Sequence, residues 1–82
     1  MSFYVYMLKS AGPNSVTYVG YTSNLKKRIS IHNTGKGAKF TRGRKWKLIF
    51  KEKFNSKNEA ISREYYIKKN RQIRNEIKKK YK

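Results

Sequence analysis

A large excess of positive charge constrains this chain more than any other feature of its sequence. Lysine and arginine number 22 against 4 acidic residues, which gives a formal net charge of +18. Such a surface repels itself, so we expect a polyanionic partner, with nucleic acid ahead of an anionic membrane and of general solubility. Any carboxylate chemistry must use one of the few acidic residues, which are Glu52, Glu59, Glu64 and Glu76.

Length and composition predict one small domain over residues 1–82. Hydrophobic residues make up only 37% of the chain, so the core must be thin. The absence of cysteine excludes disulfides and thiolate metal sites. No segment has the roughly 20 apolar residues that cross a bilayer, and the N-terminus lacks the pattern of a signal peptide. We therefore expect a cytoplasmic protein with no membrane partner.

Residue patterns predict an α+β fold, a small three-stranded antiparallel sheet flanked by helices in the order β-β-α-β-α, with a short basic C-terminal helix. The expected strands are rich in β-branched and aromatic residues and span residues 3–8, 16–21 and 46–54. Helices are expected over about 24–32 and 56–70, followed by the basic segment up to residue 82. The candidate caps are Ser23 or Asn24 for the first helix and Asn55 or Ser56 for the second.

Turn residues between the first two strands predict a hairpin. Pairing Leu8 with Val16 places Tyr6 opposite Tyr18. Because side chains alternate along a strand, Tyr6, Tyr18 and Gly20 should share one face of the sheet. In the third strand, the same alternation places Leu48 and Phe50 on one face.

Charged side chains fall on the helix faces that should pack against the sheet. The residues that share a face are Leu25, Arg28, Ile29 and His32 on the first helix, and Ile61, Glu64, Tyr65 and Lys68 on the second. A buried charge needs a partner or a metal. Two interpretations stay open, an ion pair between Glu64 and Arg28 that bridges the helices, or a site for phosphate and a cation. The tyrosines are equally compatible with ordinary strand aromatics.

Two short motifs resemble those that name a nuclease family. Tyr4-Val5-Tyr6, followed by Tyr18-Val19-Gly20, resembles the half-motifs of the GIY-YIG nucleases. The segment YVGYTSNLKKRISIHN is similar to the family's second strand and first helix, with Arg28 ten residues after Tyr18. The segment FKEKFNSKNEAISREYYIKK is similar to the third strand and the helix that carries the family's glutamate. The resemblance covers nearly the whole chain and is nearest to small stand-alone bacterial members.

The resemblance implies an endonuclease that hydrolyses phosphodiester bonds with one Mg²⁺ or Mn²⁺ ion. Glu64 would be the sole protein carboxylate on the metal, and Arg28 would hold the scissile phosphate. Tyr6 would deprotonate or position the attacking water, and Tyr18 would hydrogen-bond within the site. Hard cations prefer oxygen ligands and keep several waters, and arginine offers phosphate a bidentate fork, so the residue types suit this chemistry.

Other residues are candidates for the site or for nucleic-acid contacts. The resemblance includes a histidine at His32 in many stand-alone relatives, where a site role and a purely structural role are both open. Gly20 should leave space for close backbone or phosphate approach. The remaining candidate nucleic-acid contacts come from the basic loop at residues 35–45 and from the C-terminal half: Lys39, Thr41, Arg42, Lys68, Lys69 and Arg71. A solvated loop and a solubilising tail are the alternatives.

Three functional hypotheses follow. The first is a metal-dependent endonuclease that acts on DNA in preference to RNA, with RNA left open, and structured, nicked or damaged DNA is the candidate substrate. The second is a non-catalytic nucleic-acid-binding domain, and the third is an accessory subunit of a larger DNA repair or recombination complex. A carboxylate at Glu64 favours the first, because it would repel phosphate in a pure binder. Members that belong to excision repair often have lysine where this chain has Tyr21, so a repair role does not transfer directly.

Overall fold

The computed structural model describes residues 2–36 and 39–81, without the side chain of Lys39. Within this part of the chain, the strands are β1 (Phe3–Ser10), β2 (Thr17–Thr22) and β3 (Trp46–Phe54). The helices are α1 (Leu25–Asn33), α2 (Lys57–Lys69) and α3 (Arg71–Lys80), and a short 3₁₀ helix, η1 (Lys39–Thr41), precedes β3. This order confirms the predicted α+β fold with its basic C-terminal helix. In the described ranges, no helix has the length and apolar character needed to cross a bilayer.

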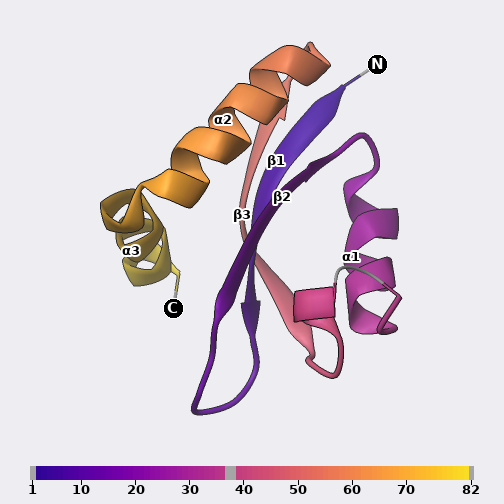
Figure 1. The fold of residues 1–82 in the computed structure, drawn as a ribbon, viewed down its shortest axis with the longest axis vertical. Helices are drawn as coiled ribbons and strands as arrows, with labels where there is room; N and C mark the ends of the chain where they lie inside the picture. The colour runs from indigo at the N-terminus through magenta and orange to yellow at the C-terminus, as the bar shows by residue number, and fades with distance from the viewer. Residues whose placement is uncertain (1, 37–38, 82) are drawn as a thin grey trace.

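The sheet is antiparallel, with the strand order β2-β1-β3. Figure 1 shows it between α1 on one side and α2 with α3 on the other. Because β1 is the central strand and both faces of the sheet are covered, its four middle residues, Val5 to Leu8, are all buried. The strand β2 lies at an edge of the sheet and pairs with β1 alone, so its outer edge has no neighbouring strand.

Each face of the sheet has its own small core. Val5 and Met7 pack against Ala60 and Ile67 of α2, and partly buried isoleucines of α3 extend this cluster. On the opposite face, Tyr6 and Leu8 pack with Trp46 and with the apolar residues of α1. The alternation of side chains along β1 therefore sends Tyr6 toward α1.

The register of the β1–β2 hairpin differs from the predicted one by two residues. Leu8 pairs with Tyr18 rather than with Val16, and Tyr6 pairs with Gly20 rather than with Tyr18. The prediction was wrong because β1 continues two residues beyond its expected end. A shift of two residues keeps every side chain on its expected face, so the tyrosines and Gly20 still share one face.

A bulge changes the register between β1 and β3. Met7 pairs with Phe50 and Leu8 with Leu48, so Ile49 has no partner of its own. We expected Leu48 and Phe50 to share a face, but the extra residue places them on opposite faces. Phe50 accordingly joins the core beside α2, and Leu48 joins the core beside α1.

The buried stripe of α2 also differs from the predicted one. Ala60 and Ile67 are fully buried, whereas Ile61 and Tyr65, expected to face the sheet, are 38% and 58% exposed. A small side chain at Ala60 permits the helix to approach the sheet closely, and this contact fixes the rotation of the helix about its axis. Glu64 lies between the two buried positions and is half-buried, so it keeps the inward position that the sequence predicts.

Polar side chains fix where the helices begin. The Asn24 side chain accepts a hydrogen bond from the N–H of Lys27 at 3.1 Å, and the Ser56 hydroxyl accepts one from the N–H of Glu59 at 3.2 Å. These are the caps expected from the sequence. Asn70 ends α2 and caps α3 in the same way, so α3 starts immediately after α2 at a fixed point.

Candidate active site

An open cleft of about 560 Å³ lies along the β2 edge of the sheet. Its lining unites four side chains that the sequence singles out, each from a different element: Tyr6 of β1, Tyr18 of β2, Arg28 of α1 and Glu64 of α2. The helices α1 and α2 lie on opposite faces of the sheet (Figure 1), and both contribute to this cleft beside the edge strand β2. A phenol pair, a guanidinium and a carboxylate therefore surround one solvent-accessible space.

Gly20 makes it possible for Tyr6 to reach this cleft. Tyr6 lies on the central strand, is 2% exposed and pairs with Gly20 on the edge strand. A Cβ atom at Gly20 would lie 2.6 Å from the phenol oxygen of Tyr6. The ring thus crosses β2 where that strand has no side chain. The space that we expected beside Gly20 for an approaching phosphate is occupied by Tyr6.

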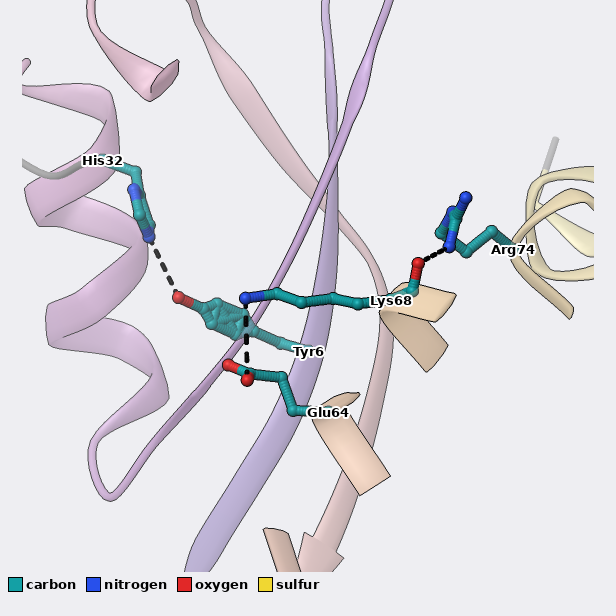
Figure 2. Close-up of polar contacts among 5 residues, drawn as sticks. All are labelled: Tyr6, His32, Glu64, Lys68 and Arg74. Carbon is teal, nitrogen blue, oxygen red and sulfur yellow. Dashed lines mark hydrogen bonds and ion pairs between the residues drawn. The ribbon is translucent and has the colours of Figure 1, made fainter. Parts of the chain in front are cut away.

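A chain of buried hydrogen bonds holds the Tyr6 hydroxyl. The phenol oxygen lies 3.0 Å from Nε2 of His32, and Nδ1 of His32 lies 3.0 Å from the hydroxyl oxygen of Thr41. Figure 2 shows the His32 ring reaching from α1 toward Tyr6. The indole N–H of Trp46 donates to the carbonyl of Thr41 at 2.9 Å, which anchors the far end. Tyr6 and His32 therefore have one defined relative orientation.

Burial sets the protonation states of this pair. It raises the pKa of the Tyr6 phenol well above its ordinary value, because the phenolate loses hydration; the nearby Tyr18 adds to this effect and Arg28 opposes it. Burial also lowers the pKa of His32, and the guanidinium of Arg28 lowers it further. At neutral pH, Tyr6 is a phenol and His32 is a neutral imidazole, so one of them can donate a proton to the other.

Tyr18 lies between the buried pair and the surface. Its ring centre is 4.9 Å from that of His32 and 6.4 Å from that of Tyr6. On the outer side, the ring stacks with Phe40, whose centre is 6.3 Å away and whose side chain is 52% exposed. Tyr18 is half-buried and lines the cleft, so it forms part of the wall that a ligand would meet.

Arg28 is exposed, although its helix face predicted an inward position. The stripe of α1 that packs on the sheet contains Ile29 and the buried His32, and Arg28 lies at the margin of that stripe, where it lines the cleft. Among the residues that the structure describes, Arg28 forms no ion pair with Glu64. The proposed bridge between the helices was therefore wrong, and the guanidinium faces solvent in the cleft.

Glu64 is paired locally. Its carboxylate lies 3.6 Å from the ammonium of Lys68, one turn further along α2, and its side chain is 17% exposed. Figure 2 shows the Lys68 side chain extending from α2 to this carboxylate. We expected Lys68 to lie on the face of α2 that packs against the sheet, but its side chain is exposed. The pair is open to water and to exchange with another cation.

The donor set at Glu64 suits a hard cation. Among the described residues, no group of three or more histidine, cysteine, aspartate or glutamate side chains surrounds a common point. That composition does not fit zinc, which takes three or four protein ligands. It fits Mg²⁺ or Mn²⁺, because such ions retain waters and accept phosphate oxygens beside one or two carboxylates.

The residues predicted to contact nucleic acid lie in different environments. The prediction that Thr41 contacts nucleic acid was wrong, because its side chain is fully buried against His32. Arg42 is exposed on the loop before β3, and Lys69 lies over the ring of Tyr65, with its ammonium 4.5 Å from the ring centre. Lys68 borders the cleft through Glu64. The side chain of Lys39 lies outside the described residues.

Sequence reasoning missed the role of Thr41, which it had singled out as a nucleic-acid contact, and it missed Lys57 altogether. Thr41 positions His32, a role that needs the loop before β3 to fold back over α1. Lys57, the first residue of α2, lines the cleft near Glu64. A single lysine among many gives no sequence signal of its own, so only the packing of α2 identifies Lys57.

The fold and this cleft define a class of protein. The GIY-YIG catalytic domain matches residues 2–81, which is almost the entire chain. The chain belongs to the GIY-YIG family, a family of nucleases, as its two half-motifs predicted.

Its relatives are small bacterial proteins. A UPF0213 protein of Clostridium perfringens is 57% identical over 67 residues, covering 80% of this chain and 70% of that protein. A UPF0213 protein of Staphylococcus haemolyticus is 52% identical over 66 residues, covering 79% of this chain and 78% of that protein. The solution NMR structure of a UPF0213 protein from Bacillus halodurans superimposes with a TM-score of 0.56 at 39% identity, covering 94% of this chain and 82% of that one.

Proposed function

We propose that this chain is a divalent-metal-dependent endonuclease that hydrolyses phosphodiester bonds in DNA. One observation carries the proposal: Tyr6, Tyr18, Arg28 and Glu64 come from four elements and line a single open cleft. A carboxylate that faces a space bordered by cations and phenols suits phosphate hydrolysis, because a bound cation turns its repulsion of phosphate into attraction. Membership of a nuclease family supports the same conclusion.

Arg28 holds the scissile phosphate in this proposal. Its exposed guanidinium has two parallel N–H groups that match two phosphoryl oxygens. Its positive charge neutralises the additional negative charge that develops as water attacks phosphorus. Tyr18, which lines the same cleft, donates a hydrogen bond from its hydroxyl to the phosphate and fixes the orientation of the phosphate.

Tyr6 and His32 together accept the proton of the attacking water. Because the pKa of Tyr6 is raised by burial, a free phenolate is costly. As the water oxygen bonds to phosphorus, its proton passes to the Tyr6 oxygen while the Tyr6 proton passes to Nε2 of neutral His32. The bond to the leaving oxygen breaks, and that oxygen takes a proton from solvent. This step requires the tautomer in which Nδ1 of His32 carries the proton and donates a hydrogen bond to the Thr41 hydroxyl, 3.0 Å away, so that Nε2 is free to accept.

Glu64 is the protein ligand for the metal. Mg²⁺ or Mn²⁺, when bound, neutralises phosphate charge and makes a coordinated water more acidic. Loading requires the Lys68 ammonium to leave the carboxylate, which its exposed position permits. The freed lysine is then available to a neighbouring phosphate.

DNA is the proposed substrate, with the backbone rather than the bases as the recognised feature. The net charge of +18 provides the attraction. Within the described residues, all three helices pack against the sheet, so none of them projects from the fold to read bases in a groove. Recognition of backbone shape fits structured, nicked or damaged DNA.

A nicking assay on supercoiled plasmid tests the proposal. With Mg²⁺ or Mn²⁺ the parent should nick the plasmid, and with EDTA it should not. Glu64→Gln should bind DNA as the parent does in EDTA and lose the nicking rate by about 10²-fold or more. Glu76→Gln, which removes an exposed carboxylate of α3, is the matched control and should nick normally.

Two outcomes would contradict the proposal. Equal nicking by Glu64→Gln and the parent removes Glu64 from the mechanism. The second outcome is a parent that binds DNA tightly but does not nick it, whether without added metal or with Mg²⁺ or Mn²⁺. That result would make the chain a non-catalytic binder or an accessory subunit of a larger repair or recombination complex.

A further inference from the structure

A second groove of about 520 Å³ lies beside the cleft, between β2 and the C-terminal helices. We call it the β2–α3 groove. It is bordered by Thr17 and Tyr18 on the strand, by Lys68 of α2, and by Arg71, Arg74 and Lys78 of α3. Among the described residues that line it, four are basic and none is acidic. A concave surface of one charge concentrates anions.

The basic residues of α3 face this groove because of their helical spacing. Arg71, Arg74 and Lys78 recur at intervals of three and four residues, which is one helix face. On another face of α3, Ile73 and Ile77 pack against the core of the sheet. The apolar contact therefore fixes the rotation of α3 so that its cations point across the groove toward β2.

The groove is preformed because α3 is tied to α2. The guanidinium of Arg74 donates to the carbonyl of Ile67 at 2.8 Å and also to the carbonyl of Lys68, as Figure 2 shows for the second contact. These are terminal carbonyls of α2, and that of Ile67 also accepts a hydrogen bond from the N–H of Asn70 at 3.2 Å. In the described part of the chain, Arg71 and Lys78 have no such partner and no ion pair, so their charge is available to a ligand.

Two residues join the groove to the cleft. Tyr18 lines both spaces. Lys68 lines the groove, while its ammonium contacts the Glu64 carboxylate in the cleft. A polymer that has one phosphate at Arg28 and Glu64 can therefore continue past Tyr18 and Lys68 into the groove without leaving the protein surface.

We propose that the β2–α3 groove binds the sugar–phosphate backbone of the nucleic-acid strand that continues from the scissile phosphate. This inference rests on the proposed function of the cleft, and it assigns phosphate contacts to Arg71 and Lys78. A row of cations along a groove matches a regular row of phosphates. A flat anionic bilayer cannot enter a concave groove, so a strand is the better fit.

Neutralising two groove residues tests the proposal. A labelled DNA duplex with a central nick is titrated in EDTA at several salt concentrations with the parent, with Arg71→Gln/Lys78→Gln, and with Lys79→Gln/Lys80→Gln. Both double variants lose two charges from the exposed surface of α3, but Lys79 and Lys80 do not line the groove. The groove variant should lower the magnitude of the log–log salt slope by about 0.9 per lost phosphate contact, hence by nearly 2. The control should change it by less than half as much.

The outcomes separate this proposal from the proposed function. Equal slopes for the two double variants, both folded by circular dichroism, overturn the groove assignment even when the parent nicks DNA. A groove variant with reduced slope beside a parent that never nicks keeps the groove and removes the nuclease. Loss of binding to phosphatidylserine vesicles in the groove variant, with unchanged DNA binding, overturns the proposal in favour of a membrane. In nicking assays, the groove variant should raise KM and leave kcat near the parent value.

Discussion

The phenol of Tyr6 lies against the backbone of Gly20 so closely that a Cβ atom there would be 2.6 Å from its oxygen and 2.8 Å from its Cζ atom. This contact connects the two half-motifs of the family in space. The first supplies the phenol and the second supplies the gap through which it reaches the cleft.

Gly20→Ala should therefore destabilise the protein and impair nicking. Forcing one methyl group into a filled site costs about 1–3 kcal/mol, and it displaces the Tyr6 hydroxyl from His32. Urea unfolding and nicking rates measure the two effects. In a Tyr6→Ala background, Gly20→Ala should cost much less, because the clashing ring is absent. An equal cost in both backgrounds would show that the contact with Tyr6 is not the reason for glycine.

The protonation of His32 predicts how stability varies with pH. Unfolded histidine binds a proton near pH 6.5, whereas burial lowers the pKa of His32 in the folded state. As the pH falls below about 6.5, the unfolded state therefore binds more protons than the folded state. The free energy of unfolding should decrease over this range and become level below the folded pKa.

Urea unfolding across the range from about pH 7.5 to pH 5 measures this effect, with His32→Gln as the reference for all other titrating groups. The parent should lose more stability than His32→Gln on acidification, although the variant is less stable at neutral pH. The nicking rate of the parent should also decline, but only as the pH falls through the lowered pKa of folded His32, because protonated His32 cannot accept the Tyr6 proton. Parallel stability profiles would show that His32 does not titrate as proposed.

Arg28→Lys tests whether the guanidinium holds the phosphate. Arg28 is exposed and makes no ion pair within the described residues, so its replacement should change stability by no more than about 0.5 kcal/mol. Lysine keeps the charge but not the bidentate fork, and the nicking rate should fall by about 10²–10³-fold. Lys27→Ala, at the neighbouring exposed position of α1, is the control and should nick nearly as fast as the parent. An unfolded Arg28→Lys would instead make Arg28 a structural residue.

The sequence was sufficient for the fold class and for four of the side chains that line the cleft, those of Tyr6, Tyr18, Arg28 and Glu64. Alternation in the strands and caps such as Asn24 and Ser56 are local signals, and they predicted the elements and their order. The half-motifs, Arg28 and Glu64 follow the order of the family's motifs along the chain, so the resemblance to the family was enough to single them out. The shared face of Tyr6 and Gly20 also survived a wrong register, because a shift of two residues conserves alternation.

Tertiary structure alone decided how those residues are arranged. The rotation of α2 depends on the close contact of Ala60 with the sheet, and it exposes Ile61 and Tyr65, which their hydrophobicity alone could not predict. The bulge at Ile49 lets Phe50 pack in the core beside α2 while Leu48 packs in the core beside α1, so it depends on both faces of the sheet. Likewise, only the placement of the two helices decided that Glu64 forms no ion pair with Arg28 among the described residues. These features arise from contacts between segments distant in sequence, and local patterns carry no record of such contacts.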